Sequence, residues 1–252
     1  LGLDGRLGGG PLSGTATATI DSGSGRFALP EVDLAVGSNR ITGALASTAA
    51  GPLSGTLSID APDLKTLAAL ALAEASGRGS AEVTLTPDGA AQSVAATFSG
   101  DGIVWQGVAV GSVKGDVAVA DALGTPMIRG SASASAVTVG DVRLDSAEAT
   151  ATTEDGTTRI AARATGPDAD LSGVVRLAGS DVHIDMLKGT AFGAALNLTQ
   201  PVTIALDGPR SEIAGATTKA RIGMGTATTP QIVRIFARLY WSPSRSAASG
   251  AS

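Results

Sequence analysis

The residues that could carry acid–base, nucleophilic or metal chemistry are few and do not form a recognisable set. His183 is the only histidine of the chain, and there is no cysteine. One histidine without cysteine cannot build a zinc site of the usual types. Serine–histidine–aspartate catalysis would depend on His183, and no Gly-x-Ser-x-Gly nucleophile elbow between a strand and a helix supports it. We therefore expect no catalytic residue, no metal site and no enzyme activity.

Motifs for nucleotides and calcium are also incomplete. Residues 21–25 contain closely spaced glycines, but no Gly-Lys-Ser/Thr follows that could hold a phosphate. The Asp-Gly pairs at 88–89, 101–102 and 155–156 lack the regular nonapeptide of calcium-binding β-rolls, and hairpin turns explain them. We expect no bound cofactor.

The element that must position any functional side chain is the β-strand. Apolar residues two apart recur from about residue 15 to about residue 207, and such alternation puts one row of side chains on each face of a strand. The pattern predicts an all-β chain with one long antiparallel sheet. In residues 182–186, His183 is expected on the solvated face with Asp181 and Asp185. The candidates for the apolar face are Val108, Val110, Val142, Leu144, Ile184, Met186, Ile204 and Leu206.

One segment departs from the alternation. Pro62 restricts the residue before it, and Asp63 can cap a following helix. Residues 64–75 have helical spacing and strong helix formers, and Gly77 is a plausible stop. The sequence predicts one short helix near 63–75 that packs on the sheet and is too short to cross a bilayer.

Composition limits the kind of core and the kind of partner. Hydrophobic residues make up 43% of the chain but aromatic residues only 3%, so small side chains must pack a thin layer or leave an apolar surface partly open. Residues 1–230 carry a net charge of −8 and residues 231–252 carry +3. An acidic body argues against a nucleic-acid partner, because phosphate binding needs a cationic stripe. The absence of cysteine decides little about the compartment.

We divide the chain into a Gly/Ser-rich start (1–26), a repetitive β body (27–210) and an irregular, disordered or foreign basic tail (211–252). Residue 1 is a leucine that is followed at once by sequence typical of mid-domain, so we expect a fragment of a longer protein. Residues 103–114 align with residues 137–148 at an offset of 34. This echo indicates either a recurring hairpin unit or a chance alignment of alternating valines.

Two phrases resemble a known family. Residues 33–45 contain Gly-x-Asn-Arg-Ile-Thr after a strand, and residues 55–64 lead from a glycine-led strand into Ala-Pro-Asp-Leu and the short helix. This order is similar to the TamB-type translocation and assembly module proteins of the AsmA-like group. Residues 129–131 and 142–145 also resemble the repetitive β body of that family. The resemblance covers about residues 27–210, and the segment after 230 does not fit it.

The resemblance implies a long curled sheet, a β-taco or open β-helix, with an apolar inner groove. It implies a parent protein that is anchored in the inner membrane of a Gram-negative bacterium and crosses the periplasm. Phospholipid acyl chains and an Omp85-type outer-membrane assembly protein are the implied partners, and phospholipid transport to the outer membrane and outer-membrane protein assembly are the implied roles. A structural or adhesive surface β-solenoid without lipid transport remains the alternative. An N-terminal membrane anchor in the parent would favour the lipid-transporting protein. A cleaved signal peptide together with a C-terminal barrel would favour the surface β-solenoid.

Overall fold

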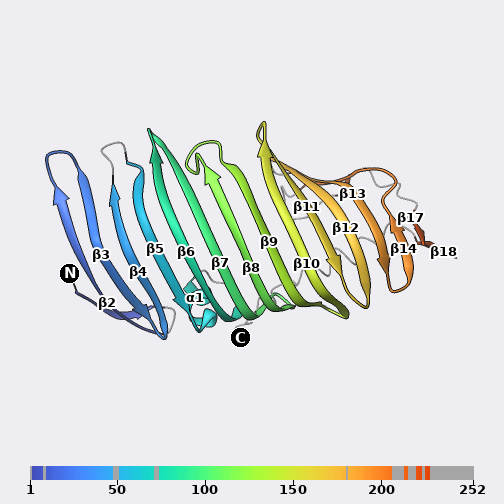
Figure 1. Cartoon of the computed structure of the whole chain (residues 1–252), viewed down its shortest axis with the longest axis horizontal. Coiled ribbons are helices and arrows are strands. Elements are labelled where there is room, and N and C mark those ends of the chain that lie inside the picture. Colours follow the sequence, from blue (N-terminus) through green and yellow to red (C-terminus); the bar gives the residue numbers. More distant parts are fainter. Residues whose placement is uncertain are drawn as a thin grey trace, which may run out of the picture.

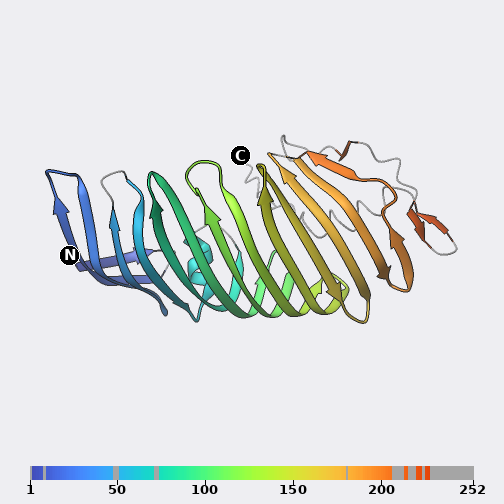
Figure 2. The same cartoon turned by 45° about the horizontal axis from the view of Figure 1, so that its top comes forward.

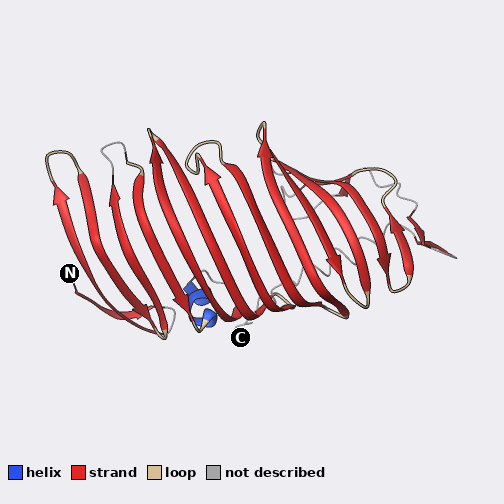
Figure 3. Cartoon of the chain, viewed as in Figure 1, coloured by secondary structure: helices blue, strands red, loops and turns tan. Residues whose placement is uncertain are grey.

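A single antiparallel sheet makes up nearly all of the structure, a computed structural model (Figures 1 and 3). The prediction of an all-β chain with one long antiparallel sheet and one short helix is confirmed. The structure describes residues 2–7, 10–47, 51–70, 74–179, 181–205, 213–214, 220–222 and 225–227.

Within these residues the sheet has 16 strands, and consecutive strands pair in chain order from β1 to β13, followed by β15 and β16. Strand β14 pairs with the other end of β13, and β17 and β18 form a separate pair. The sheet does not close, because β1 and β16 are its two edges. The strands are β1 (Gly2–Leu7), β2 (Gly10–Asp21), β3 (Arg26–Val36), β4 (Asn39–Ser47), β5 (Leu53–Ala61), β6 (Ala75–Asp88), β7 (Ala91–Trp105), β8 (Val108–Ala120), β9 (Met127–Val139), β10 (Val142–Glu154), β11 (Thr157–Thr165), β12 (Ala169–Ala178), β13 (Asp181–Ala191), β14 (Ala194–Asn197), β15 (Val202–Ala205), β16 (Ile213–Ala214), β17 (Ala220–Ile222) and β18 (Gly225–Ala227).

The sheet has one apolar face and one polar face. Half-buried and exposed residues alternate along the whole of β6, with Ala81 and Val83 in the first set and Glu82 and Thr84 in the second. Neighbouring side chains of a pleated strand point to opposite faces. Phe98 of β7 stands opposite Ala81 in the register and continues the same side. We call the side of these residues the apolar face and the reverse the polar face.

The lower ends of β6 to β10 bend along one line. Residues on this line have no partner in the cross-strand register, whereas the residues before and after them on each strand are paired. Gly102 (φ 59°) and Ala136 (φ 50°) take the left-handed backbone conformation there, which is costly for a residue with a Cβ. Figure 2 shows the sheet curling along this border. We call the line the crease; its residues are Gly77, Gly102, Gly111, Ala136 and Asp145.

The crease shifts the alternation by one residue. Gly100 and Ile103 are three apart, yet a Cβ on Gly100 would lie 3.1 Å from Ile103 Cδ1. Gly100 is two residues from Phe98, so Ile103 lies on the apolar face as well. Ile103 stands in register with apolar residues of the next three strands, and the apolar face therefore continues below the crease. These residues are Val110, Val137 and Leu144.

A buried glutamine repairs one gap in the sheet. Extending the register of the pair Gly55 and Leu85 by two residues brings Leu53 of β5 opposite Pro87 of β6, which has no N–H to donate. Gln92 of β7, 5% exposed, reaches this point. Its Oε1 accepts the Leu53 N–H (2.6 Å) and its Nε2 donates to the Leu53 carbonyl (3.0 Å). The side-chain amide thus supplies the pairing that the proline cannot.

Helix α1 (Leu64–Leu70) lies on the lower part of the sheet, where it contacts β6 and β4 (Figures 1 and 3). Asp63 caps it: its carboxylate accepts the Lys65 N–H (3.1 Å) and the Thr66 hydroxyl (2.7 Å). The helix is shorter than the predicted 63–75, since Ala75 already belongs to β6 and residues 71–73 are outside the described part.

The crease predicts opposite effects for the same substitution at two positions of β9. Ala136→Gly removes the cost of a left-handed alanine and should leave the free energy of unfolding unchanged or raise it by up to about 1 kcal/mol. Ala134→Gly, in extended backbone two residues away, should lower that free energy by about 0.5–1 kcal/mol. Urea unfolding of the two variants measures the difference. Equal destabilisation by both would contradict the crease.

Candidate functional site

One continuous row of apolar side chains and glycines crosses twelve strands. Each member stands opposite the next in the register, so the row runs across the strands along the length of the sheet. Eleven strand spacings of about 4.8 Å give it a length of roughly 50 Å. We call it the central row. From β2 to β13 its members are Gly14, Leu34, Ile41, Ile59, Ala81, Phe98, Gly115, Ala132, Ala149, Ala162, Gly173 and Leu187.

Two parallel rows extend the central row on either side. The first, which we call the upper row, lies two residues from the central row toward the upper ends of the strands. It has one apolar residue or glycine on each strand from β2 to β13, and it continues to β15. Toward the crease a second row runs from β5 to β13. The upper row includes Leu57, Val83, Val117, Ile160, Val175 and Ile184, and the row next to the crease includes Gly79, Gly100, Val113, Ala134, Ala147, Ala164 and Leu171.

The reverse of the sheet carries the opposite chemistry. Residues one position away from the central row form a polar row from β4 to β13. Hydroxyl pairs connect neighbouring strands on this face, as between Ser80 and Ser99 (2.9 Å) and between Ser112 and Ser135 (2.7 Å). Water can therefore solvate the polar face. The polar row consists of Arg40, Asp60, Ser80, Ser99, Lys114, Ser133, Glu148, Arg163, Ser172 and Lys188.

The apolar face is largely uncovered. In a protein with a closed core, most of these side chains would be buried, but in the described part of this chain the buried valines and alanines number six. One of the six, Val174, stands at a polar-face position of β12. Helix α1 covers the face near β4 and β6, and a Cβ on Gly79 would lie 3.8 Å from Leu64 Cδ1. Elsewhere the three rows are mostly half-buried. The six buried residues are Val32, Val36, Ala61, Val137, Ala169 and Val174.

The apolar face is hollowed between β8 and β13. A cavity of about 380 Å³ lies there, and members of all three rows border it. Val113 marks its β8 end and Ile184 its β13 end, with alanines of β9, β10 and β11 between them. The cavity is our candidate binding site.

Below the crease, four of the predicted groove residues lie on the apolar face. Val110 and Leu144 both pair with Val137, which is 8% exposed. Val108 and Val142 stand two residues nearer the lower border. All four lie on the apolar face because the crease shifts the alternation, and none of them borders the cavity.

The other four predicted residues have separate positions. Ile184 and Met186 both border the cavity. A β-bulge makes Ile184 pair with Val175 and Met186 with Val174. The register therefore places Ile184 in the upper row of the apolar face and Met186 at a position of the polar face. Ile204 lies in β15 opposite Val182, and its side chain is outside the described part. Leu206 is not described.

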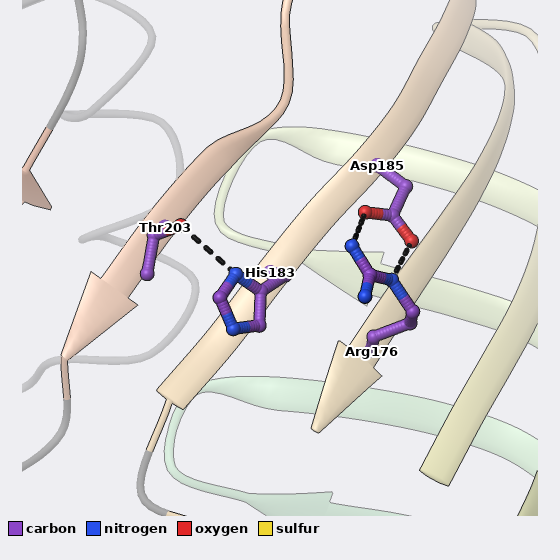
Figure 4. Close-up of polar contacts among 4 residues, drawn as sticks. All are labelled: Arg176, His183, Asp185 and Thr203. Carbon is purple, nitrogen blue, oxygen red and sulfur yellow. Dashed lines mark hydrogen bonds and ion pairs between the residues drawn. The ribbon is translucent and has the colours of Figure 1, made fainter. Parts of the chain in front are cut away.

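The polar contacts around His183 connect β13 with its two neighbours, β12 and β15 (Figure 4). His183 Nδ1 lies 2.9 Å from Thr203 Oγ1 on β15. The bulged Asp185 forms a two-pronged ion pair with Arg176, with Arg176 Nη2 at 2.7 Å from Asp185 Oδ1. Hydrogen bonding from Arg176 lowers the pKa of Asp185. His183, half-buried, faces the polar side, in register with Arg176.

A polar link that the sequence did not indicate joins two distant segments. Asn39, 1% exposed, donates from Nδ2 to the Val36 carbonyl (3.1 Å) and accepts the Asp63 N–H on Oδ1 (3.0 Å). It thus connects the β3–β4 hairpin to the cap of α1. Both segments belong to the phrases that resemble the TamB-type proteins. Only the buried geometry reveals this role, since asparagine after Gly37 is typical of an ordinary turn.

No family model, curated protein or solved structure matches the chain. In the described ranges, no three or more His, Cys, Asp or Glu side chains are grouped to hold a metal ion. No helix among the same residues is long and apolar enough to span a bilayer.

Replacing Asn39 should destabilise the fold more than replacing an exposed asparagine. Asn39→Ala leaves the Asp63 N–H and the Val36 carbonyl without their partner, which costs about 1–3 kcal/mol. Asn197→Ala, at an exposed position of β14, should change the free energy of unfolding by less than about 0.5 kcal/mol. Urea unfolding followed by circular dichroism measures both. Similar midpoints for the two variants would contradict the structural role of Asn39.

Acid should weaken the fold through the half-buried carboxylates of Asp168 and Asp185, whose arginine partners are exposed. Hydrogen bonds from the Arg143 backbone and side chain lower the pKa of Asp168, and a hydrogen bond from Arg176 lowers that of Asp185. Their stabilisation is complete above the unfolded pKa and is lost as the pH falls through the lower folded pKa. We expect the unfolding temperature to fall below about pH 4, modestly, because ion pairs with an exposed partner contribute little. Asp185→Asn should reduce this pH dependence; an unchanged acid profile would contradict the pairing.

Proposed function

We propose that this chain is a segment of a lipid-conducting bridge, in which hydrocarbon tails lie along the apolar face. The observation that carries the proposal is the central row, because twelve successive strands present apolar side chains or glycines at one level. In the described part of the chain, helix α1 is the one element outside the sheet that covers this face. Large exposed apolar surfaces mark interaction or ligand sites. Here the surface is continuous along roughly 50 Å, which suits a path more than a single closed pocket.

The energetics favour hydrocarbon on such a surface. Each methylene group removed from water contributes about 0.8 kcal/mol. A tail of about 14 methylenes with half its surface against the sheet would gain on the order of 5 kcal/mol. A gain of this size holds a lipid and still lets it move along the row. The polar face meanwhile keeps the segment compatible with an aqueous compartment.

The resemblance to TamB-type proteins adds the biological setting. The contact between Asn39 and Asp63 brings together the two phrases that carry the resemblance, which supports reading them as one structural unit. On this basis the parent is anchored in the inner membrane and crosses the periplasm of a Gram-negative bacterium. It transfers phospholipid between the membranes, and an Omp85-type outer-membrane assembly protein is its partner.

Photo-crosslinking in the full-length parent tests the proposal. A benzophenone amino acid at Leu144 or Ile184 should capture phospholipid several-fold more than the same group at Arg143 or Lys114, which are exposed on the other side. Lipid extraction of the crosslinked protein and mass spectrometry measure the capture. Equal capture from both faces would refute the bridge and favour the structural or adhesive alternative.

A further inference from the structure

The apolar face changes its side-chain size partway along the sheet. From β3 to β7 the central row includes Leu34, Ile41, Ile59 and Phe98, whereas from β8 to β12 it contains only alanine and glycine. Three neighbouring strands contribute two alanines each to a patch that we call the alanine floor. It consists of Ala132, Ala134, Ala147, Ala149, Ala162 and Ala164.

Larger residues flank the alanine floor at three points, whereas Gly115, Gly173 and Gly130 border it elsewhere. In the row next to the crease, Val113 stands beside Ala134, and Leu171 stands beside Ala164. In the upper row, Ile160 lies two residues from Ala162 on the same strand. Because alanine side chains are shorter than these three, the floor is sunken beside them. All six alanines border the cavity of about 380 Å³.

We propose that the alanine floor is a binding site for one unbranched hydrocarbon chain that lies across β9, β10 and β11. The inference rests on the proposed function and adds to it a resting position along the path and the shape of the ligand. The cavity is about two and a half times the 150 Å³ of an apolar cavity that holds benzene. It therefore has room for on the order of 15 carbon atoms.

The dimensions of the site match such a chain. From β8 to β13 the cavity crosses five strand spacings, which gives a length of about 24 Å. Its floor is narrow, since only two alanines of each strand contribute. A long and narrow depression fits an extended chain better than a bulky fused ring system.

The chemistry of the floor favours hydrocarbon over a peptide strand. The backbones of β9, β10 and β11 are paired on both sides within the sheet, so they have no free groups to offer. The alanine side chains cannot form hydrogen bonds. Ser133 and Glu148 also border the cavity, but they stand at polar-row positions, and the exposed lining is almost entirely apolar. A bound peptide strand would leave its own N–H and C=O groups unpaired, at a cost of several kcal/mol per group. A hydrocarbon chain has no such groups.

Binding of cis-parinaric acid, a straight-chain fluorescent fatty acid, to the 252-residue chain tests the site. Ala149→Leu fills the centre of the floor and should weaken binding by about tenfold. Thr150→Leu adds similar apolar bulk at the next residue, which is exposed on the polar face, and should change the affinity less than about twofold. Equal affinities for the two variants would overturn the assignment.

Crosslinking of the unmodified chain tests the site without any substitution, so its result does not depend on whether a variant folds. A straight-chain fatty acid with a diazirine at its end should label residues of β9, β10 and β11. Labelling confined to β3–β6 would overturn the alanine floor but leave the proposed path intact. Absence of any saturable binding by the unmodified chain would overturn both the site and the proposed function.

Discussion

The structure depends on cross-strand register. With a side-chain period of two, a slip of one residue in a single strand would turn its apolar side chains to water and put its charges on the apolar face. The central row and the polar row can run side by side over ten strands only because every hairpin preserves this phase. The alternation of faces shifts by one residue at two of the places described above. At the crease, β7 to β10 shift together, so their rows stay aligned. The bulge at Asp185 affects β13 alone.

Buried polar side chains connect elements of this sheet that, in a two-layered protein, a second layer would hold together. Asn39 and Gln92 are the two buried polar residues of the described part, and each connects elements that the ladder does not connect. Asn39 holds the helix cap to a hairpin, and Gln92 bridges a gap left by a proline. A buried amide can satisfy a backbone donor and an acceptor at once, so asparagine and glutamine suit positions where regular pairing fails.

The sequence predicted the sheet, the helix and most of the apolar face, because these follow from local periodicity and strong helix formers. Local pattern does not give the strand boundaries, because Gly100 and Lys114 lie inside the long strands β7 and β8. Glycine and lysine in a strand resemble turn signals, but neighbouring strands on both sides hold the extended backbone in place. Strand boundaries thus depended on pairing that one segment does not reveal.

The candidate site was predictable in kind but not in position. Alternation indicates which residues share a face within one strand, as for Val110 and Leu144. It does not indicate the bulge that separates Met186 from Ile184. The six alanines were not singled out, because alanine in a strand carries little signal until three strands are aligned. Only the cross-strand register shows that the six alanines lie side by side, because they come from three separate stretches of the sequence.

Connection by hairpins between neighbours has a consequence for how such a protein can change in size. Each strand from β2 to β12 touches mainly the one before and the one after it, as in repeat proteins whose units contact only adjacent units. Insertion or loss of a complete up-and-down pair would preserve strand direction and both faces, whereas loss of one strand would reverse every strand that follows. Evolution can therefore change the length of the sheet in steps of two strands, about 10 Å each.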